Sequence, residues 1–273
     1  MKVVILCGGK GYRLREETEF KAKPMVDIGG KPLLWHIMKI YAHYGHKEFI
    51  LPLGYKGDTI KQFFVEEKWR ANDFTLDSSK NKITLHKNSE EQDWIIHFVD
   101  TGIETNTALR LYRVKHLLKD EEDFLFTYGD GVSDININEV IELHKRTGTV
   151  ATLTGVNAPS RFGVIKESYG KVEFFQEKPK TEDFVNGGFM VLNKKIFDYL
   201  SEDNVMFEAT TLPHLATGGQ LSIYKHAGFW YSMDTYRDYM ELNKMWEASA
   251  PWAVWKKRNE LSLDNGTPWE FKK

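Results

Sequence analysis

A short apolar run that leads directly into a glycine-rich turn constrains this chain more than any other feature of its sequence. Residues 3–6 read Val-Val-Ile-Leu, and Gly8, Gly9 and Gly11 follow. A short run of this kind is typical of a buried strand in a parallel sheet that is covered on both faces. Because glycines carry no side chains, backbone N–H groups of the turn can converge on an anion at the carboxyl edge of the sheet. The pattern therefore predicts a phosphate-binding loop in an α/β fold.

Two basic residues after the turn suit a polyphosphate. Arg13 offers a rigid fork of donors that matches phosphate oxygens, and Lys23 offers a more flexible point charge. The loop alone leaves open an alternative, which is a glycine-rich turn with solvated basic residues. The spacing of the glycines fits neither the Walker loop nor the dinucleotide-binding fingerprint. Those two nucleotide folds are therefore disfavoured.

The composition limits the classes of protein to which the chain can belong. Its 273 residues suffice for one large α/β domain with a substantial core. Lys and Arg total 37 against 39 Asp and Glu, so no net field attracts nucleic acid or an anionic membrane. We expect one domain over residues 1–247, with a C-terminal tail over 248–273. We expect this domain to have two halves, which cover about 1–155 and about 156–247.

The only cysteine and the first residues indicate where the protein works. Cys7 excludes an intrachain disulfide and fits a reducing compartment, and its place at a strand end favours packing over a reactive thiol. Met1 and Lys2 lead into the first strand without signal-peptide architecture. No apolar run approaches the roughly 20 residues that span a bilayer. We therefore expect a cytoplasmic protein without a membrane partner.

Strand and helix patterns alternate through the first half of the chain. A helix that begins near Pro32 and ends at Gly45 is an example, because proline suits a first helical turn and glycine suits an end. The alternation predicts a Rossmann-like, mainly parallel sheet flanked by helices. We expect strands over 48–53, 94–99, 124–127 and 149–154, and helices over 58–64, from about 107 and over 138–145.

Two regions depart from this alternation. The chain turns polar from Glu66 to Asp93, which predicts an inserted hairpin or a flexible excursion. Segments of this length often serve as lids or subunit contacts. Closely spaced strands in the second half predict a mixed, antiparallel part. We expect these strands over 162–165, 171–175, 188–192 and 221–224, and helices over 208–217 and 236–246. Trp252 and Trp255 should dock on the body or on a neighbouring subunit, while 261–273 should be loosely ordered.

Two aspartates follow predicted strands. Asp130 lies between two glycines at the carboxyl end of the strand over 124–127, where open α/β sheets bind ligands. Asp234 comes just before the helix that starts at Tyr236. Each has an ordinary alternative, because Asp-Gly is a common turn pair and aspartate often caps a helix. Together they predict a Mg²⁺ site, because Mg²⁺ prefers carboxylate oxygens.

Polar residues of the second half suit a phosphorylated sugar. Glu177 can accept hydrogen bonds from sugar hydroxyls, Lys178 can bind a monophosphate, and Asn186 can both donate and accept. Plain surface polarity is the alternative for all three. His36, which lies on the helix that begins near Pro32, is expected to pack rather than to act in catalysis.

The motifs, taken in order along almost the whole chain, resemble the sugar-phosphate nucleotidyltransferase family. Within that family the likeness is strongest to the branch that uses CTP and glucose 1-phosphate. The segments that carry it are Gly8-Gly9-Lys10-Gly11-Tyr12-Arg13-Leu14, Lys21-Ala22-Lys23-Pro24-Met25, Gly29-Gly30-Lys31-Pro32, Trp35-His36-Ile37-Met38, Tyr128-Gly129-Asp130-Gly131, Glu177-Lys178-Pro179, Asn186-Gly187-Gly188-Phe189 and Met233-Asp234-Thr235.

The resemblance implies a Mg²⁺-dependent transfer of CMP from CTP to a sugar 1-phosphate, by a homo-oligomer (hexamer or trimer) that makes a nucleotide sugar for surface polysaccharide such as O-antigen. It implies Arg13 and Lys23 as catalytic residues and Asp130 and Asp234 as metal ligands. Glu177, Lys178 and Asn186 would bind the sugar phosphate. The implied nucleotide-binding residues are Leu6, Cys7, Gly8, Gly9, Lys10, Gly11, Tyr12, Arg13, Lys23, Thr105, Arg110 and Gly129.

The chain departs from the family pattern at three places. Tyr12 stands where a small hydroxyl residue is common, Leu109 stands at a glycine position, and Thr210-Thr211 replace Glu-Pro. These departures leave open another nucleotide base or another phosphorylated acceptor. They also leave open a regulatory subunit that binds a nucleotide without turnover. A glycosyltransferase is disfavoured, because Arg13 and Lys23 suit a leaving pyrophosphate.

Overall fold

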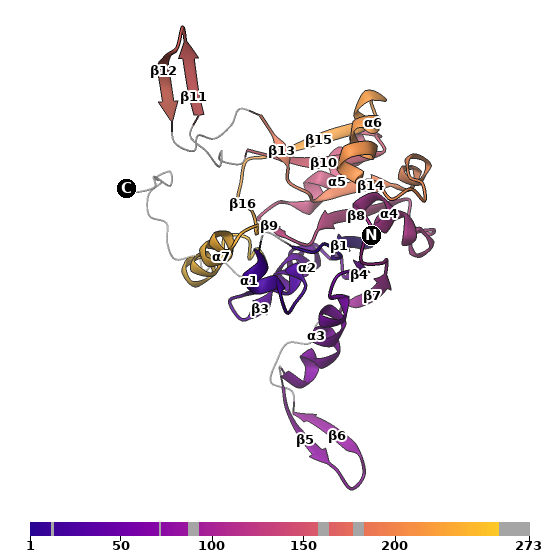
Figure 1. The fold of residues 1–273 in the computed structure, drawn as a ribbon. Coiled ribbons are helices and arrows are strands. Elements are labelled where there is room, and N and C mark those ends of the chain that lie inside the picture. Colours follow the sequence, from indigo (N-terminus) through magenta and orange to yellow (C-terminus); the bar gives the residue numbers. More distant parts are fainter. Residues whose placement is uncertain (12–13, 71, 87–92, 158–163, 177–182, 257–273) are drawn as a thin grey trace.

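The computed structural model describes residues 1–11, 14–70, 72–86, 93–157, 164–176 and 183–256 (Figure 1). These residues form a central mixed sheet with helices on both faces. The sheet has eight strands in the order β13-β10-β14-β8-β1-β4-β7, with β15 also paired to β10. Strands β4 and β8 both pair parallel with β1, and β7 pairs parallel with β4. Strand β14 lies between β8 and β10 and runs antiparallel to both. The predicted fold class is confirmed.

The first half follows the expected alternation closely. The predicted helices and strands begin and end within a few residues of their expected bounds, except that one helix continues through 66–70, which the sequence assigned to the polar excursion. The elements are β1 (Val3–Leu6), α1 (Arg15–Thr18), η2 (Lys23–Met25), β2 (Asp27–Ile28), β3 (Lys31–Pro32), α2 (Leu33–His43), β4 (Glu48–Leu53), α3 (Gly57–Arg70), β7 (Ile95–Asp100), α4 (Thr107–Arg113), η3 (Lys115–Leu117) and β8 (Asp123–Tyr128). The short elements α1, η2, β2, β3 and η3 were not predicted as elements of their own.

The second half is mixed, as predicted. The expected helix over 208–217 starts with a π-helical turn, η5 (Phe207–Thr211), before α6 (Leu212–Thr217). The other elements are β9 (Gly131–Ser133), α5 (Ile137–Thr147), β10 (Ala151–Val156), β13 (Val185–Asn186), β14 (Met190–Asn193), η4 (Lys194–Tyr199), β15 (Leu221–His226), β16 (Trp230–Ser232) and α7 (Tyr236–Ala248).

Two β-hairpins extend away from the body (Figure 1). The first, β5 (Asp73–Asp77) with β6 (Lys82–His86), follows α3 and confirms the predicted hairpin insertion. The second is β11 (Val164–Ser168) with β12 (Lys171–Gln176). Each pairs only within itself among the described strands. Whether the first is a lid or a subunit contact stays a prediction.

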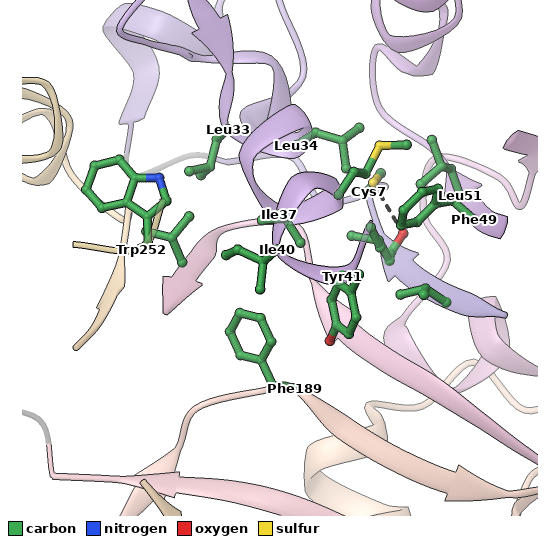
Figure 2. Packing of buried hydrophobic residues seen from close by; sticks show 14 of the residues in the cluster. Cys7, Leu33, Leu34, Ile37, Ile40, Tyr41, Phe49, Leu51, Phe189 and Trp252 are labelled. Carbon is green, nitrogen blue, oxygen red and sulfur yellow. Dashed lines mark hydrogen bonds between the residues drawn. The ribbon is translucent and has the colours of Figure 1, made fainter. Parts of the chain in front are cut away.

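Strand β1 is buried on both faces of the sheet. Val3, Ile5 and Cys7 pack in one hydrophobic cluster, whereas Val4 and Leu6 pack in the other. Helix α2 covers the first of these faces, with Leu33, Leu34, Ile37 and Tyr41 fully buried (Figure 2). The sequence of β1 was read as that of such a strand, and this prediction is confirmed.

The C-terminal tail docks on the body through tryptophan, as predicted. Trp252 is fully buried and stacks on Phe229. Its indole Nε1 donates to Nδ1 of His36 at 3.3 Å, and Nε2 of His36 donates to the Ile28 carbonyl at 2.8 Å. Burial lowers the pKa of His36 to about 4, so its role is packing. Residues 261–273 lie outside the described part of the chain.

None of the helices formed by described residues has the length and apolarity needed to cross a membrane.

Candidate active site

The glycine-rich turn lies at the carboxyl end of β1, as the sequence predicts. Cys7 continues the sheet by a hydrogen bond from its backbone N–H to the Pro52 carbonyl at 3.2 Å. Gly11 has a φ of 64°, a left-handed conformation that favours glycine. Tyr12 and Arg13 lie outside the described residues, so their predicted roles stay predictions.

Cys7 itself is packing, which confirms the sequence reading. Its side chain is 1% exposed and its thiol donates to the Ile5 carbonyl at 3.2 Å. Burial raises the pKa of the thiol well above its usual range. A thiolate is therefore disfavoured, and the residue contributes its backbone to the turn.

Arg110 lies behind the turn and holds it in place. The guanidinium is 3% exposed and donates to the carbonyls of Gly8 at 3.0 Å and Leu53 at 2.9 Å, and to Oγ1 of Thr101 at 2.7 Å. A Cβ at Gly8 would lie 2.1 Å from Cζ of Arg110, so a larger residue there would have to displace the guanidinium. Arg110 thus joins β1, β4 and β7 at the edge where a ligand would bind, and its predicted contact with a nucleotide stays a prediction.

Lys23 and the two predicted metal ligands meet at one point. The Lys23 ammonium donates to Oδ2 of Asp130 at 2.7 Å and to Oδ1 of Asp234 at 2.9 Å. Burial by itself lowers the pKa of Lys23, but the charges and hydrogen bonds of the two aspartates outweigh this effect, so the pKa is raised. The structure therefore brings together three predicted site residues that are up to 211 positions apart in sequence.

The pairing of two short strands explains how the aspartates meet. Strand β9 follows Asp130 directly, β16 ends two residues before Asp234, and the two strands pair antiparallel with Gly131 opposite Ser232. The N–H of Met233 then donates to the Asp130 carbonyl at 2.8 Å. One strand pair thus holds both carboxylates at the same end.

Gly129 allows the segment that carries Lys23 to pack closely against the end of the sheet. A Cβ at Gly129 would lie 2.7 Å from the Leu6 carbonyl and 2.9 Å from Cγ of Pro24. Because Gly129 has none, the turn before Asp130 packs directly on the residue after Lys23. The predicted role of Gly129 in binding a nucleotide stays a prediction.

The aspartate pair fits a divalent cation. Both donors are hard carboxylate oxygens, and the Lys23 ammonium between them shows that this position favours a positive charge. The described residues contain no group of three His, Cys, Asp or Glu side chains that could hold a metal ion. Two protein carboxylates with substrate phosphates and water are the usual way in which Mg²⁺ is bound.

Tyr128 links the aspartates to the residues that were predicted to bind the sugar, because it precedes Asp130 in the chain and contacts Asn186. Asn186 donates from Nδ2 to the Tyr128 hydroxyl at 3.2 Å, and its Oδ1 accepts from the N–H of Gly188 at 3.0 Å. Trp230 of β16 donates from Nε1 to the Gly187 carbonyl at 2.8 Å. The predicted sugar residue Asn186 thus contacts Tyr128, which precedes Asp130 by two positions in the chain. Glu177 and Lys178 lie outside the described residues.

Glu208 is a candidate residue that the sequence reading missed. It lies in the π-helical turn η5, a form that is frequent at functional sites. Its Oε2 accepts from Oγ1 of Thr107 at 2.7 Å, whereas its Oε1 is buried and has no hydrogen-bond partner among the described residues. Burial and this nearby carboxylate raise the pKa of Tyr128, although the two side chains lack hydrogen-bond geometry. A free buried acceptor beside Tyr128 suits a ligand hydroxyl.

Two other predicted nucleotide-binding residues lie at the rim. Lys10 forms an ion pair with Glu104. Oγ1 of Thr105 donates to the Thr101 carbonyl and accepts from Nη1 of Arg113 at 3.2 Å. These contacts join the glycine turn to the segment before α4. Neither shows a contact with a nucleotide, so the roles stay predictions.

Comparison with known proteins gives a consistent result. Residues 2–249 match the family described as nucleotidyl transferase. The chain is 47% identical over 257 residues to proteins of Bacillus subtilis, named "Probable glucose-1-phosphate cytidylyltransferase", and of Salmonella typhi, named "Glucose-1-phosphate cytidylyltransferase". Each match covers 93% of this chain and 100% of the relative. The solved structure of HddC from Yersinia pseudotuberculosis with GMP-PN has the same fold, at a TM-score of 0.65 and 21% identity over 90% of this chain and 99% of that one.

Proposed function

The chain belongs to the nucleotidyl transferase family, and we propose that it is the enzyme that transfers CMP from CTP to glucose 1-phosphate, which forms CDP-glucose and releases pyrophosphate. The named relatives, at 47% identity over their whole length, support this activity. The observation that carries the proposal in the structure is the meeting of Lys23, Asp130 and Asp234 at the glycine-rich turn.

The reaction needs alignment and charge neutralisation rather than a general base. A phosphate oxygen of the sugar phosphate, already anionic at neutral pH, attacks the α-phosphorus of CTP in line with the leaving pyrophosphate. The protein's contribution is to hold both phosphates and to stabilise the charge that develops. Arg13 holds the pyrophosphate and Lys23 holds the α-phosphate. For that role Lys23 leaves the two aspartates and turns toward the nucleotide.

Asp130 and Asp234 would hold Mg²⁺. When bound, the ion supplies neutralisation of the phosphate charges at the reacting centre. The residues' own contribution is geometric, since the β9–β16 pair places the two carboxylates at one end.

The acceptor is proposed to bind beside Tyr128. Asn186 and the free oxygen of Glu208 are proposed to face sugar hydroxyls, and Glu177 and Lys178 keep their predicted roles as ligands of the sugar phosphate. A buried carboxylate oxygen without a partner costs about 1–3 kcal/mol, and a hydroxyl of the sugar removes that cost. Glu208 therefore contributes to the choice of acceptor.

The test is a panel of radiolabelled CTP, UTP and dTTP with several sugar 1-phosphates. We expect pyrophosphate release to require Mg²⁺ and to be fastest with CTP and glucose 1-phosphate. Release with another pair would identify a different base or acceptor, as Leu109 and Thr210-Thr211 allow. Tight binding of CTP by calorimetry without any release would favour the regulatory subunit instead.

We propose further that the enzyme is a cytoplasmic homo-oligomer, a hexamer or trimer, whose copies meet through the two hairpins. Each hairpin carries several exposed apolar side chains, at 41–62% exposure, and exposed apolar residues that are grouped in this way mark interaction surfaces. Their edges have no partner among the described strands, and a second copy can cover them. These side chains are Phe74, Leu76 and Ile83 in the first hairpin and Ile165, Val172, Phe174 and Phe175 in the second.

Light scattering tests the assembly. The wild type is expected to have the mass of a hexamer or trimer. The double variant Leu76→Ser with Phe175→Ser is expected to have a smaller mass. Phe20→Ser, which changes an exposed aromatic outside the hairpins, is the matched control and should leave the mass unchanged. A monomeric wild type would contradict the assembly and leave the enzyme activity to be judged by the panel.

A further inference from the structure

The carboxylate of Asp238 accepts hydrogen bonds from the backbone of Asp234 and from residues before and after it. Asp238 lies one helical turn later, at the start of α7, and its Oδ2 accepts from the N–H of Asp234 at 3.0 Å. The same oxygen accepts from the N–H of Thr235 at 2.8 Å and from Oγ1 of Thr235 at 2.9 Å. Three donors around Asp234 therefore converge on one oxygen atom.

The second oxygen of Asp238 reaches the strand that precedes Asp234. Oδ1 accepts from the Tyr231 hydroxyl at 3.2 Å. Tyr231 lies in β16, whose partner β9 begins directly after Asp130. Burial and the Asp238 carboxylate raise the pKa of Tyr231, so its hydroxyl stays a donor. One side chain thus joins the strand before Asp234 to the helix after it.

Helix capping alone accounts for only part of this arrangement. Thr235 and Asp238 form a capping box, in which Thr235 accepts from the N–H of Asp238 at 3.3 Å and Asp238 satisfies the N–H of Thr235. The bonds to the N–H of Asp234 and to the Tyr231 hydroxyl lie outside that box. Both of them fix the backbone from which the Asp234 carboxylate reaches the cation position.

We propose that Asp238 is a positioning residue for Asp234, which sets the direction of that carboxylate toward the divalent cation. The inference rests on the proposed function, since it assigns Asp234 to the metal. Groups that orient a metal ligand typically change metal affinity by 10-fold to 100-fold when they are removed. Asp238 does not touch the cation or the substrate and acts only through Asp234 and its neighbours.

The experiment compares three variants of the full chain. Asp238→Ala removes all four accepted hydrogen bonds. Asp238→Asn keeps an amide oxygen for the three donors near Asp234, and the Tyr231 hydroxyl can accept from the amide nitrogen. Asn136→Ala is the matched control, because Asn136 caps α5 by accepting from the N–H of Asn138 at 3.1 Å, outside the described contacts of Lys23, Asp130 and Asp234. Loss of either cap costs about 1 kcal/mol of stability.

The readout is Mn²⁺ binding, followed by electron paramagnetic resonance in the presence of the α,β-methylene analogue of CTP. Asp238→Ala should weaken Mn²⁺ binding by about 10-fold or more. The Mn²⁺ affinity of Asp238→Asn should stay within about threefold of the wild-type affinity. Asn136→Ala should bind Mn²⁺ as the wild type does, although its melting temperature should fall as much as that of Asp238→Ala. Hydrogen exchange of ligand-free Asp238→Ala should rise at the N–H groups of 234 and 235.

Several outcomes would overturn the proposal. Equal Mn²⁺ affinity in Asp238→Ala and the wild type would reduce Asp238 to a helix cap. Equal loss in Asn136→Ala would assign the effect to stability, and equal loss in Asp238→Asn would assign it to charge rather than to geometry. A wild type that binds the analogue but no Mn²⁺ would remove the metal site, and the positioning role with it. The substrate panel would then judge the transfer reaction separately.

Discussion

Replacement of Lys23 by methionine separates its two roles. Methionine keeps most of the length and apolar contact of the side chain but removes the ammonium that lies 2.7 Å from Asp130 and 2.9 Å from Asp234. In the ligand-free protein the two carboxylates then lose the ammonium that both of them contact. With substrates bound, the α-phosphate loses one of its cations.

The magnitudes follow from exposure and from the type of contact. The side chains of Lys23 and Asp234 are each 14% exposed, whereas Asp130 is 35% exposed. Removal of one partner from a buried pair costs about 3–5 kcal/mol and exposed pairs contribute at most about 1 kcal/mol, so we expect about 2 kcal/mol less stability without metal. Loss of one preorganised donor to the transition state removes about 2–4 kcal/mol, or roughly 30-fold to 1000-fold in kcat.

Urea unfolding and pyrophosphate release measure these two effects. Mg²⁺ should stabilise Lys23→Met more than the wild type, because the cation no longer competes with the ammonium for the aspartates and binds only the folded state. Lys21→Met is the control, because Lys21 forms ion pairs with Glu17 and Asp27 rather than with Asp130 or Asp234. A Lys23→Met enzyme with wild-type stability, no added response to Mg²⁺ and kcat within about threefold would refute the reasoning.

Two further predictions follow from buried groups. Burial lowers the pKa of His36 to about 4, so the residue is neutral in the folded protein. In the unfolded chain the same side chain has its ordinary pKa of about 6.5 and takes up a proton as the pH falls. The free energy of unfolding should therefore fall by about 2 kcal/mol from pH 7 to pH 5. Chemical denaturation of His36→Gln should lack that part of the pH dependence, and an unchanged profile would contradict it. Gly8→Ala should displace Arg110, whose Cζ would lie 2.1 Å from the new Cβ, and should raise KM for the nucleotide by about tenfold, the effect of about 1.4 kcal/mol. An unchanged KM would show that the turn does not depend on this contact.

The parts of the fold that could be predicted depend on local sequence. The strand over 48–53 was predicted with its observed bounds, because an apolar run between a polar loop and a glycine defines both ends. The other long strands of the first half were predicted for the same reason. Residues 66–70 were assigned to a loop for their polarity, yet charged residues are good helix formers and α3 continues through them.

The parts that could not be predicted depend on pairs that are distant in sequence. Strands β9 and β16 have three residues each and pair across about a hundred positions, so neither has a periodic signal. The free oxygen of Glu208 depends on Thr107 in another helix, and a π-helical turn has no sequence period of its own. Asp238 did have a signal, since Thr235 followed by an acid three residues later is the pattern of a capping box.

The convergence of Lys23 with both aspartates was only partly foreseen. The sequence placed the three residues at one crevice, with Lys23 on a phosphate and the aspartates on a metal. The structure instead pairs Lys23 with both carboxylates. An ammonium can pair with a carboxylate as well as with a phosphate, and the sequence does not determine which of them lies next to Lys23.

A crystal structure with CTP and Mn²⁺ tests the central claim most directly. The account predicts an anomalous peak bound by Asp130 and Asp234, the triphosphate along the glycine-rich turn, and the Lys23 ammonium moved from the carboxylates onto the α-phosphate. Nucleotide bound elsewhere, with Lys23 still paired to both aspartates and no peak between them, would contradict it.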